Sequence, residues 1–229
     1  MLGVMPGLIH IVGARPNFIK AAPVIEALRA AGAQQQVIHT GQHYDRAMSD
    51  VFFDQLGLPH PDGNLGVGSG SHAQQTAALL TALETAFGAS RPDRVVVYGD
   101  VNSTLAAALV CAKMLIPVAH VEAGLRSFDE SMPEEINRRV TDLLADPLYV
   151  TAPEGQQNLA AEGVEGARVV FVGNPMIDTL LKHLDRFDPA PVTAELGIDG
   201  RYGVATLHRP ANVDSAAAAT ALVLSLIHI

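Results

Sequence analysis

The sequence predicts an α/β fold: a doubly wound, Rossmann-like parallel sheet, followed by the start of a second Rossmann-like domain. Short apolar runs rich in valine and isoleucine alternate along the chain with longer stretches rich in alanine and leucine. The short runs are apolar almost throughout, which is typical of strands that are buried on both faces of a parallel sheet. Several runs are followed by a proline that can open a helix, which completes the strand–helix alternation.

The expected strands are compact apolar runs that end at a glycine or a polar residue. In chain order they cover residues 8–12, 36–40, 94–98, 117–121, 148–151 and 169–172. The expected helices carry apolar residues three or four positions apart. They run from Pro16 to Gly32, from Leu79 to Gly88, from Thr104 to Met114, and onward from Pro133, Pro153 and Pro175. Residues 1–185 are therefore expected to form the N-terminal domain.

Residues 186–229 are expected to hold a linker and the beginning of a second domain. The proline-rich segment 188–191 has the composition of a linker, residues 202–207 that of a strand, and the stretch from Asp214 onward that of a helix. One strand and one helix cannot bury a core of their own. We therefore expect the sequence to be truncated inside this domain, and residues 225–229 to be of doubtful origin.

The composition excludes several classes of protein. The chain has 15 Lys and Arg residues against 24 Asp and Glu, and the resulting net charge of −9 disfavours binding to nucleic acid. The single cysteine, Cys111, excludes an intramolecular disulfide and fits a reducing compartment. No apolar stretch reaches the length of a membrane span, and the first residues lack the pattern of a signal peptide. We expect a cytoplasmic protein that binds neither nucleic acid nor membrane.

Two cations follow the first expected strand, where parallel sheets bind their ligands. Arg15 and Lys20 lie in the first turns of the helix that carries Pro16. Free N–H groups, the helix dipole and two positive side chains together make an anion site. The glycine-rich fingerprints of dinucleotide and phosphate loops are absent from this turn. The alternative, a solvated helix start with two surface cations, stays open.

Carboxylates follow two strands that should be neighbours in the sheet. Asp100 ends one strand, Glu122 follows the next, and Glu134 and Glu135 lie at the head of the helix that begins at Pro133. Clustered carboxylates suit proton transfer at carbon, which needs a base on one face and an acid on the other. A metal site is the less favoured use of them, and we expect no metal or cofactor. For Glu135 a role toward the helix dipole is favoured.

The histidines and the cysteine divide into two groups. His208 directly follows the strand expected at 202–207, so it joins the reactive residues at strand ends. His10 and His120 lie within expected strands and Cys111 lies within an expected helix. We expect these three side chains to be part of the core.

Seven short motifs occur in the same order as in a known enzyme family. They are GARPNFIK at 13–20, TGQH at 40–43, GD at 99–100, HVEAGLR at 120–126, PEEINR at 133–138, GN at 173–174 and TLHR at 206–209. From about residue 8 to about residue 214 the chain thus resembles the non-hydrolysing UDP-N-acetylglucosamine 2-epimerases. The resemblance implies two Rossmann-like domains around a cleft, as in the GT-B glycosyltransferases, with a nucleotide-binding second domain.

The resemblance also implies an activity and a set of site residues. Members interconvert UDP-N-acetylglucosamine and UDP-N-acetylmannosamine, by elimination and re-addition of UDP, for surface polysaccharide supply. UDP-N-acetylglucosamine and UDP are the implied ligands, and the implied full-length state is a homodimer. The residues implied in catalysis are Asp100, Glu122, Glu134 and His208. Those implied in substrate binding are Arg15, Lys20, Arg138 and again Asp100, Glu122 and His208.

Three alternatives stay open. A hydrolysing epimerase would release N-acetylmannosamine and UDP, a GT-B glycosyltransferase would pass the sugar to an acceptor, and a catalytically silent fragment would at most bind nucleotide. Because family members continue past residue 229, we expect this chain to bind UDP-sugar poorly and to turn over little. The sequence does not assign base and acid among the carboxylates.

Overall fold

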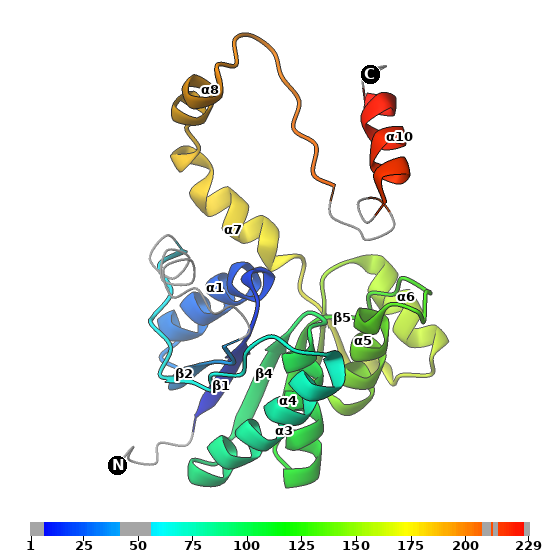
Figure 1. The fold of residues 1–229 in the computed structure, drawn as a ribbon. Helices are drawn as coiled ribbons and strands as arrows, with labels where there is room; N and C mark the ends of the chain where they lie inside the picture. Colours follow the sequence, from blue (N-terminus) through cyan, green and yellow to red (C-terminus); the bar gives the residue numbers. More distant parts are fainter. Residues whose placement is uncertain (1–6, 42–55, 208–211, 213–214, 227–229) are drawn as a thin grey trace. The chain divides into compact units, whose positions relative to one another are not determined.

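The computed structural model describes residues 7–41, 56–207, 212 and 215–226. The chain divides into two compact units, Met1–Asp185 and Arg186–Ile229. Within the described part of the first unit, seven parallel strands form one sheet in the order β3-β2-β1-β4-β5-β6-β7 (Figure 1). The predicted doubly wound parallel sheet is confirmed.

Strands and helices alternate through the first unit. The described strands are β1 (Leu8–Val12), β2 (Gln35–His39), β3 (Gly63–Asn64), β4 (Arg94–Tyr98), β5 (Val118–Ala123), β6 (Leu148–Val150) and β7 (Val169–Phe171). The described helices are α1 (Arg15–Ala30), α3 (His72–Ala89), α4 (Asn102–Met114), α5 (Pro133–Leu144), α6 (Pro153–Ala161) and α7 (Pro175–His183). Short 3₁₀ helices lie at Gly166–Arg168 and Leu184–Arg186.

The winding direction of the sheet reverses between β1 and β4. The chain first moves outward from β1 through β2 to β3, and then crosses to the other side of β1 to form β4 through β7. The carboxyl ends of β1 and β4 therefore meet at the topological switch point, which is where open α/β sheets bind their ligands.

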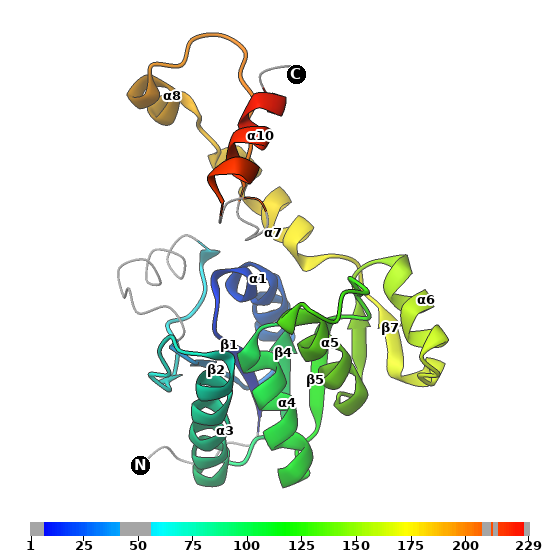
Figure 2. The same cartoon turned by 45° about the vertical axis from the view of Figure 1, so that its right-hand side comes forward.

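Alternate side chains of β4 belong to two separate cores. Val95 and Val97 pack with apolar side chains of α3 and α4, whereas Val96 and Tyr98 pack with those of α1. Figure 2 shows α3 and α4 on one side of the sheet and α1 on the other. Because both faces of the strand are covered, a polar side chain along it must find a partner inside the protein.

Several boundaries in the first unit differ from the sequence-based expectation, and the short strand β3 was not predicted. The helix α3 begins at His72, ahead of the expected Leu79. The helix α3 continues through Gly88 and ends at Ala89. The strand β5 continues to Ala123, so that Glu122 lies within the strand and not after it. Cys111 is buried in the core between the sheet and α4, as predicted. Within the described residues, no helix is long and apolar enough to cross a bilayer.

The second unit corrects two expectations. Residues 202–207 do not form the predicted strand: they are exposed and irregular, because no neighbouring strand in the described residues offers its backbone groups. The expected linker at 188–191 instead leads into a helix, α8 (Ala190–Leu196). The proline at its start and Gly197 in the left-handed conformation at its end are signals for a helix of this length. The predicted helix near the end is present as α10 (Ala216–Leu226).

His10 is a core histidine, as predicted, and it is held neutral. Its ring is fully buried, with Nδ1 2.7 Å from the Tyr98 hydroxyl and Nε2 2.9 Å from Oε1 of Gln35. A neutral ring satisfies both partners, since the Tyr98 hydroxyl donates to Nδ1 and Nε2–H donates to Gln35. Burial lowers the pKa of His10 to about 4, despite the opposing hydrogen bond to Gln35.

We predict that acid weakens the fold through His10. Between pH 6.5 and pH 4, His10 is protonated in the unfolded chain but stays neutral in the folded chain. The free energy of unfolding should therefore fall by about 3 kcal/mol over this interval from His10 alone, with no further loss from this residue below pH 4. Denaturant titrations at several pH values should give a flatter profile for His10→Gln than for the unchanged protein. The exposed His60→Gln serves as the control, and parallel profiles for all three proteins would contradict the prediction.

Candidate active site

The candidate site lies at the switch point, at the carboxyl ends of β1, β4 and β5. Lys20 enters from α1, which follows β1, and Asp100 comes two residues after the end of β4. Glu122 comes from the end of β5, and Arg138 comes from α5. Four separate segments of the sequence therefore supply the charged side chains, and the order of the strands brings them together.

An ion pair between Lys20 and Glu122 forms one half of the site. The Lys20 ammonium donates to Oε2 of Glu122, and both side chains are largely shielded from solvent. Gly99 lies directly beside this pair: a Cβ on Gly99 would be 2.8 Å from Nζ of Lys20 and 3.1 Å from Oε2 of Glu122. The backbone of Gly99 is also left-handed, with φ of +64°. The position therefore requires glycine on two grounds, its conformation and the lack of space.

The backbone of Glu122 is strained. Its φ is +77°, which L side chains rarely adopt. The pairing of β5 with β6 shifts register between Val121 and Ala123, so Glu122 lies in a β-bulge. A bulge redirects a side chain relative to the regular alternation of a strand. The bulge thus explains how a residue inside β5 reaches Lys20 at the edge of the sheet.

A second set of ion pairs, centred on Arg138, forms the other half. The guanidinium donates to Oδ2 of Asp100 at 2.6 Å and to Oε2 of Glu135 at 2.8 Å. Because Gly99 and Asp100 are consecutive, the Arg138 set and the Lys20–Glu122 pair are neighbours. Three carboxylates, those of Asp100, Glu122 and Glu135, and two cations therefore surround the turn after β4.

Glu135 anchors the loop between β5 and α5. Its buried carboxylate accepts hydrogen bonds from N–H and Oγ of Ser127, both at 2.8 Å, and from N–H of Phe128 at 3.3 Å. Burial alone would raise the pKa of Glu135, but the bonds from Ser127 and Arg138 outweigh it and hold that pKa below its usual value. Its place in the first turn of α5 fits the favoured role toward the helix dipole, and the loop contacts add a function that the sequence did not indicate.

Two asparagines that the sequence analysis missed hold the edges of the site. Oδ1 of Asn17 accepts from the N–H groups of Gly13 and Ala14, at 3.1 and 3.0 Å, and its Nδ2 donates to the carbonyl of Tyr98 at 2.8 Å. Nδ2 of Asn137 donates to the carbonyl of Asp100 at 2.8 Å. Both residues lie inside the resembling motifs, directly after Pro16 and before Arg138, and only this placement could have indicated them.

The remaining predicted residues are not placed in the site by a contact. Glu134 is half-buried in the first turn of α5, one helical turn before Arg138, and has no partner among the residues that the structure describes. Arg15 begins α1, but its side chain is outside the described part of the chain. His208 also lies outside the described residues.

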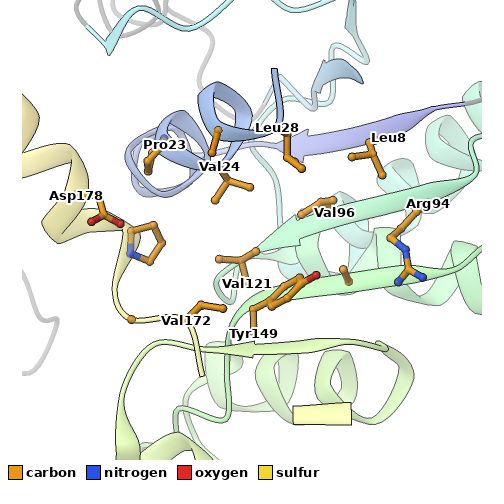
Figure 3. Close-up of a pocket in the computed structure, with 14 residues that line it drawn as sticks. Leu8, Pro23, Val24, Leu28, Arg94, Val96, Val121, Tyr149, Val172 and Asp178 are labelled. Carbon is orange, nitrogen blue, oxygen red and sulfur yellow. The ribbon is translucent and has the colours of Figure 1, made fainter. Parts of the chain in front are cut away.

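A separate hollow of about 410 Å³ lies between α1 and the sheet, and Figure 3 shows the side chains around it. Most of its lining is apolar, as with Val24, Val96 and Val121, and the polar groups include Arg94 and Asp178. The lining includes neither Asp100 nor Glu122. The hollow and the charged site are therefore different features of the first unit.

The charged site is equipped for acid–base chemistry on an anionic molecule. Carboxylates of two neighbouring strands can exchange protons with a substrate, and the cations beside them can stabilise negative charge. The charges of Lys20, Glu122, Arg138 and Asp100 each have an opposite partner within the protein, which offsets the cost of their partial burial.

We predict that Gly99→Ala displaces Lys20 from Glu122. The new methyl group would occupy the space beside Nζ, and alanine at a positive φ should lower the free energy of unfolding by about 1–2 kcal/mol. Lys20 should then react several-fold faster with an amine-acetylating reagent, measured by mass spectrometry of its peptide.

Gly163→Ala is the matched control for this substitution. Gly163 has φ of +79°, and a Cβ there would meet nothing within 4 Å. It should therefore show a similar loss of stability with no change in Lys20 labelling. Equal labelling of Lys20 in the two variants would show that Gly99 does not make room for the ion pair.

Comparison with known proteins identifies the family to which this chain belongs. A sequence profile described as UDP-N-acetylglucosamine 2-epimerase matches residues 26–229. The UDP-N-acetylglucosamine 2-epimerase of Methanocaldococcus jannaschii is 44% identical over 209 residues, which are 90% of this chain and 57% of that protein. The UDP-2,3-diacetamido-2,3-dideoxy-D-glucuronate 2-epimerase of Pseudomonas aeruginosa is 43% identical over 224 residues, which are 96% and 62%. The chain thus spans 57% to 62% of the length of these two relatives.

Solved structures agree with the sequence match. A crystal structure of the Methanocaldococcus jannaschii UDP-GlcNAc 2-epimerase in complex with UDP-GlcNAc and UDP has a TM-score of 0.88 at 41% identity, covering 96% of this chain and 62% of that chain. The Neisseria meningitidis enzyme bound to UDP-GlcNAc has a TM-score of 0.74 at 31% identity, covering 83% and 51%. On the family profile, the relatives and the shared fold, the chain belongs to the UDP-N-acetylglucosamine 2-epimerase family.

Proposed function

We propose that this protein interconverts UDP-N-acetylglucosamine and UDP-N-acetylmannosamine without releasing free sugar. The observation that carries the proposal is the pair of salt bridges, Lys20–Glu122 and Arg138–Asp100, on either side of the turn after β4. Relatives named for this epimerisation, and a solved relative holding UDP-GlcNAc and UDP, support the choice of substrate.

The proposed reaction needs a base, an acid and a stabilised leaving group. A carboxylate takes the proton from the second sugar carbon while the bond from the first carbon to UDP breaks, which leaves a double bond between the two carbons. UDP then adds back as a proton returns to the opposite face of the second carbon. Asp100 and Glu122, which come from neighbouring strands, are the proposed acid–base groups. Lys20 and Arg138 are proposed to stabilise the charge of the departing diphosphate.

Three further residues are assigned roles on the family motifs. Glu134 is the third proposed catalytic carboxylate, and its position one turn before Arg138 supports this choice. Arg15 is proposed to bind substrate from the start of α1, and His208 to meet the phosphates of the nucleotide and to assist catalysis.

A second substrate has a specific observation in its favour. The Pseudomonas aeruginosa relative named UDP-2,3-diacetamido-2,3-dideoxy-D-glucuronate 2-epimerase is 43% identical to this chain, which is close to the 44% of the Methanocaldococcus jannaschii enzyme. The same epimerisation at the second carbon would serve that sugar. Both UDP-sugars should therefore be tested in parallel, and faster epimerisation of the diacetamido sugar would replace our choice of substrate.

We predict that Asp100→Asn stops hydrogen exchange at the second sugar carbon. Asparagine keeps the volume of the side chain but cannot take up a proton, so solvent deuterium entry into UDP-N-acetylglucosamine should fall at least 100-fold, about 2.7 kcal/mol of barrier. Proton NMR of the sugar measures the exchange. Asp93→Asn is the control, because Asp93 is exposed just before β4, at the opposite end of the strand. If the rate of deuterium entry in Asp100→Asn stays within tenfold of that of the unchanged protein, Asp100 is not a catalytic acid or base.

Product analysis separates the proposal from its alternatives. We expect UDP-N-acetylmannosamine to accumulate, with both anomeric signals still coupled to phosphorus in the NMR spectrum. Free N-acetylmannosamine with UDP would identify a hydrolysing epimerase. The absence of deuterium entry above a protein-free blank would contradict the proposed activity for this chain. It would agree with the expectation of little turnover, and favour a protein that at most binds nucleotide.

A further inference from the structure

A buried histidine lies directly beneath the candidate site. His120 is in β5, two residues before Glu122, and its ring is completely buried. Its Nε2 lies 2.8 Å from the carbonyl oxygen of Gly99, and its Nδ1 lies 2.7 Å from Oδ1 of Asp142. The ring thus connects the turn that leads into Asp100 with helix α5.

The carboxylate of Asp142 holds the bulge of β5 from both sides. Its Oδ1 meets the ring of His120 before the bulge, and its Oδ2 accepts from N–H of Gly124 after the bulge, at 3.0 Å. Glu122, with its strained backbone, lies between these two attachment points. A conformation that costs about 1–3 kcal/mol persists only where surrounding contacts fix it, and Asp142 supplies two of them.

Asp142 is itself kept ionised by its neighbours. Oδ2 also accepts from Nη1 of Arg126 at 2.8 Å, and the same guanidinium binds Glu162 with its other nitrogens at 2.8 and 2.7 Å. Burial alone would raise the pKa of the Asp142 carboxyl, but the hydrogen bonds and charges of His120 and Arg126 outweigh it and keep that pKa below its usual value.

The partners of His120 fix its protonation. A carbonyl oxygen and an ionised carboxylate can both only accept a hydrogen bond, whereas a neutral imidazole donates from one nitrogen alone. A neutral ring would therefore point a lone pair at either Gly99 or Asp142, inside a dry core where an unmet acceptor is costly. An imidazolium satisfies both partners.

We propose that His120 and Asp142 form the positioning pair of the active site, in which a doubly protonated His120 ring sets the Gly99–Asp100 turn and the bulge of Glu122 relative to each other. His120 and Asp142 do not touch the substrate in this arrangement. They fix the spacing of the two carboxylates that are proposed to act on opposite faces of the sugar, so this inference rests on the proposed function.

The protonation of His120 can be measured without any catalysis. Nitrogen-15 NMR of the histidine-labelled protein at pH 7 should show both ring nitrogens of His120 carrying a proton, with the signals assigned by their loss in His120→Asn. The buried His10 offers an internal comparison, since its ring is neutral at this pH. A His120 ring with one proton-free nitrogen would overturn the proposal.

Substitutions then test the positioning itself. Asp142→Asn should lower kcat for deuterium entry at the second sugar carbon at least 30-fold and leave KM within threefold, because the spacing of the carboxylates changes while the binding cations remain. Glu162→Gln, at the outer end of the same network, is the control and should stay within threefold on both parameters. An equal loss in the two variants, or a rise in KM that accounts for the loss in Asp142→Asn, would indicate a merely structural network.

A matched pair of variants separates the two contacts of the ring. The amide nitrogen of His120→Gln can take the place of Nε2 and donate to Gly99, whereas that of His120→Asn can take the place of Nδ1 and donate to Asp142. Each should therefore keep a higher kcat than His120→Ala. If neither does, His120 does not act through these hydrogen bonds.

The two proposals fail in distinguishable ways. A protein that shows no deuterium entry contradicts the proposed function, while the NMR signature of His120 still decides whether the ring is the imidazolium that the contacts require. An active protein with a neutral His120 ring leaves the proposed function standing and overturns the positioning pair.

Discussion

The burial of β4 and β5 on both faces is the constraint from which the other features follow. Successive side chains of β4 enter two different cores, so neither face of the strand is open to solvent. Most charged groups lie at the carboxyl ends of such strands, and a charge along their length, such as the one proposed for His120, requires partners inside the protein. The buried polar side chains of His10 in β1, Tyr98 in β4 and His120 in β5 are each hydrogen-bonded within the protein. The same burial thus creates both the sheet and the charged edge.

The charged edge is arranged as pairs because its members are partly withdrawn from water. Lys20 pairs with Glu122, Arg138 pairs with both Asp100 and Glu135, and the turn at Gly99 is so close to the Lys20–Glu122 pair that it has no room for a side chain. A second layer beneath, from Gly99 through His120 to Asp142, fixes the backbone on which these groups stand. The candidate site is therefore a layer of ion-paired charges on a buried, hydrogen-bonded base.

Local pattern was sufficient to predict every described strand of the sheet except the two-residue β3, and to predict that Asp100 and Glu122 lie at the ends of neighbouring strands. The bulge at Glu122 was not predictable, because it depends on contacts with Asp142, which lies in a later helix. The partner of Glu122 was equally hidden, since Lys20 is 102 positions away in the sequence. Residues 202–207 have the composition of a strand and are not one, because a strand needs a neighbour to bond with.

The hydrogen bonds of the Asn17 amide determine how a change of this residue to aspartate would act. Its oxygen faces two N–H groups and its nitrogen faces the carbonyl of Tyr98, which also accepts from the Thr104 hydroxyl. Aspartate has the same shape as asparagine, and substitution tables score the exchange as mild. At this position it would set a negatively charged oxygen against the Tyr98 carbonyl and loosen α1 from the sheet. A substitution that conserves size would here remove the donor to Tyr98 and bring a negative charge next to its carbonyl oxygen.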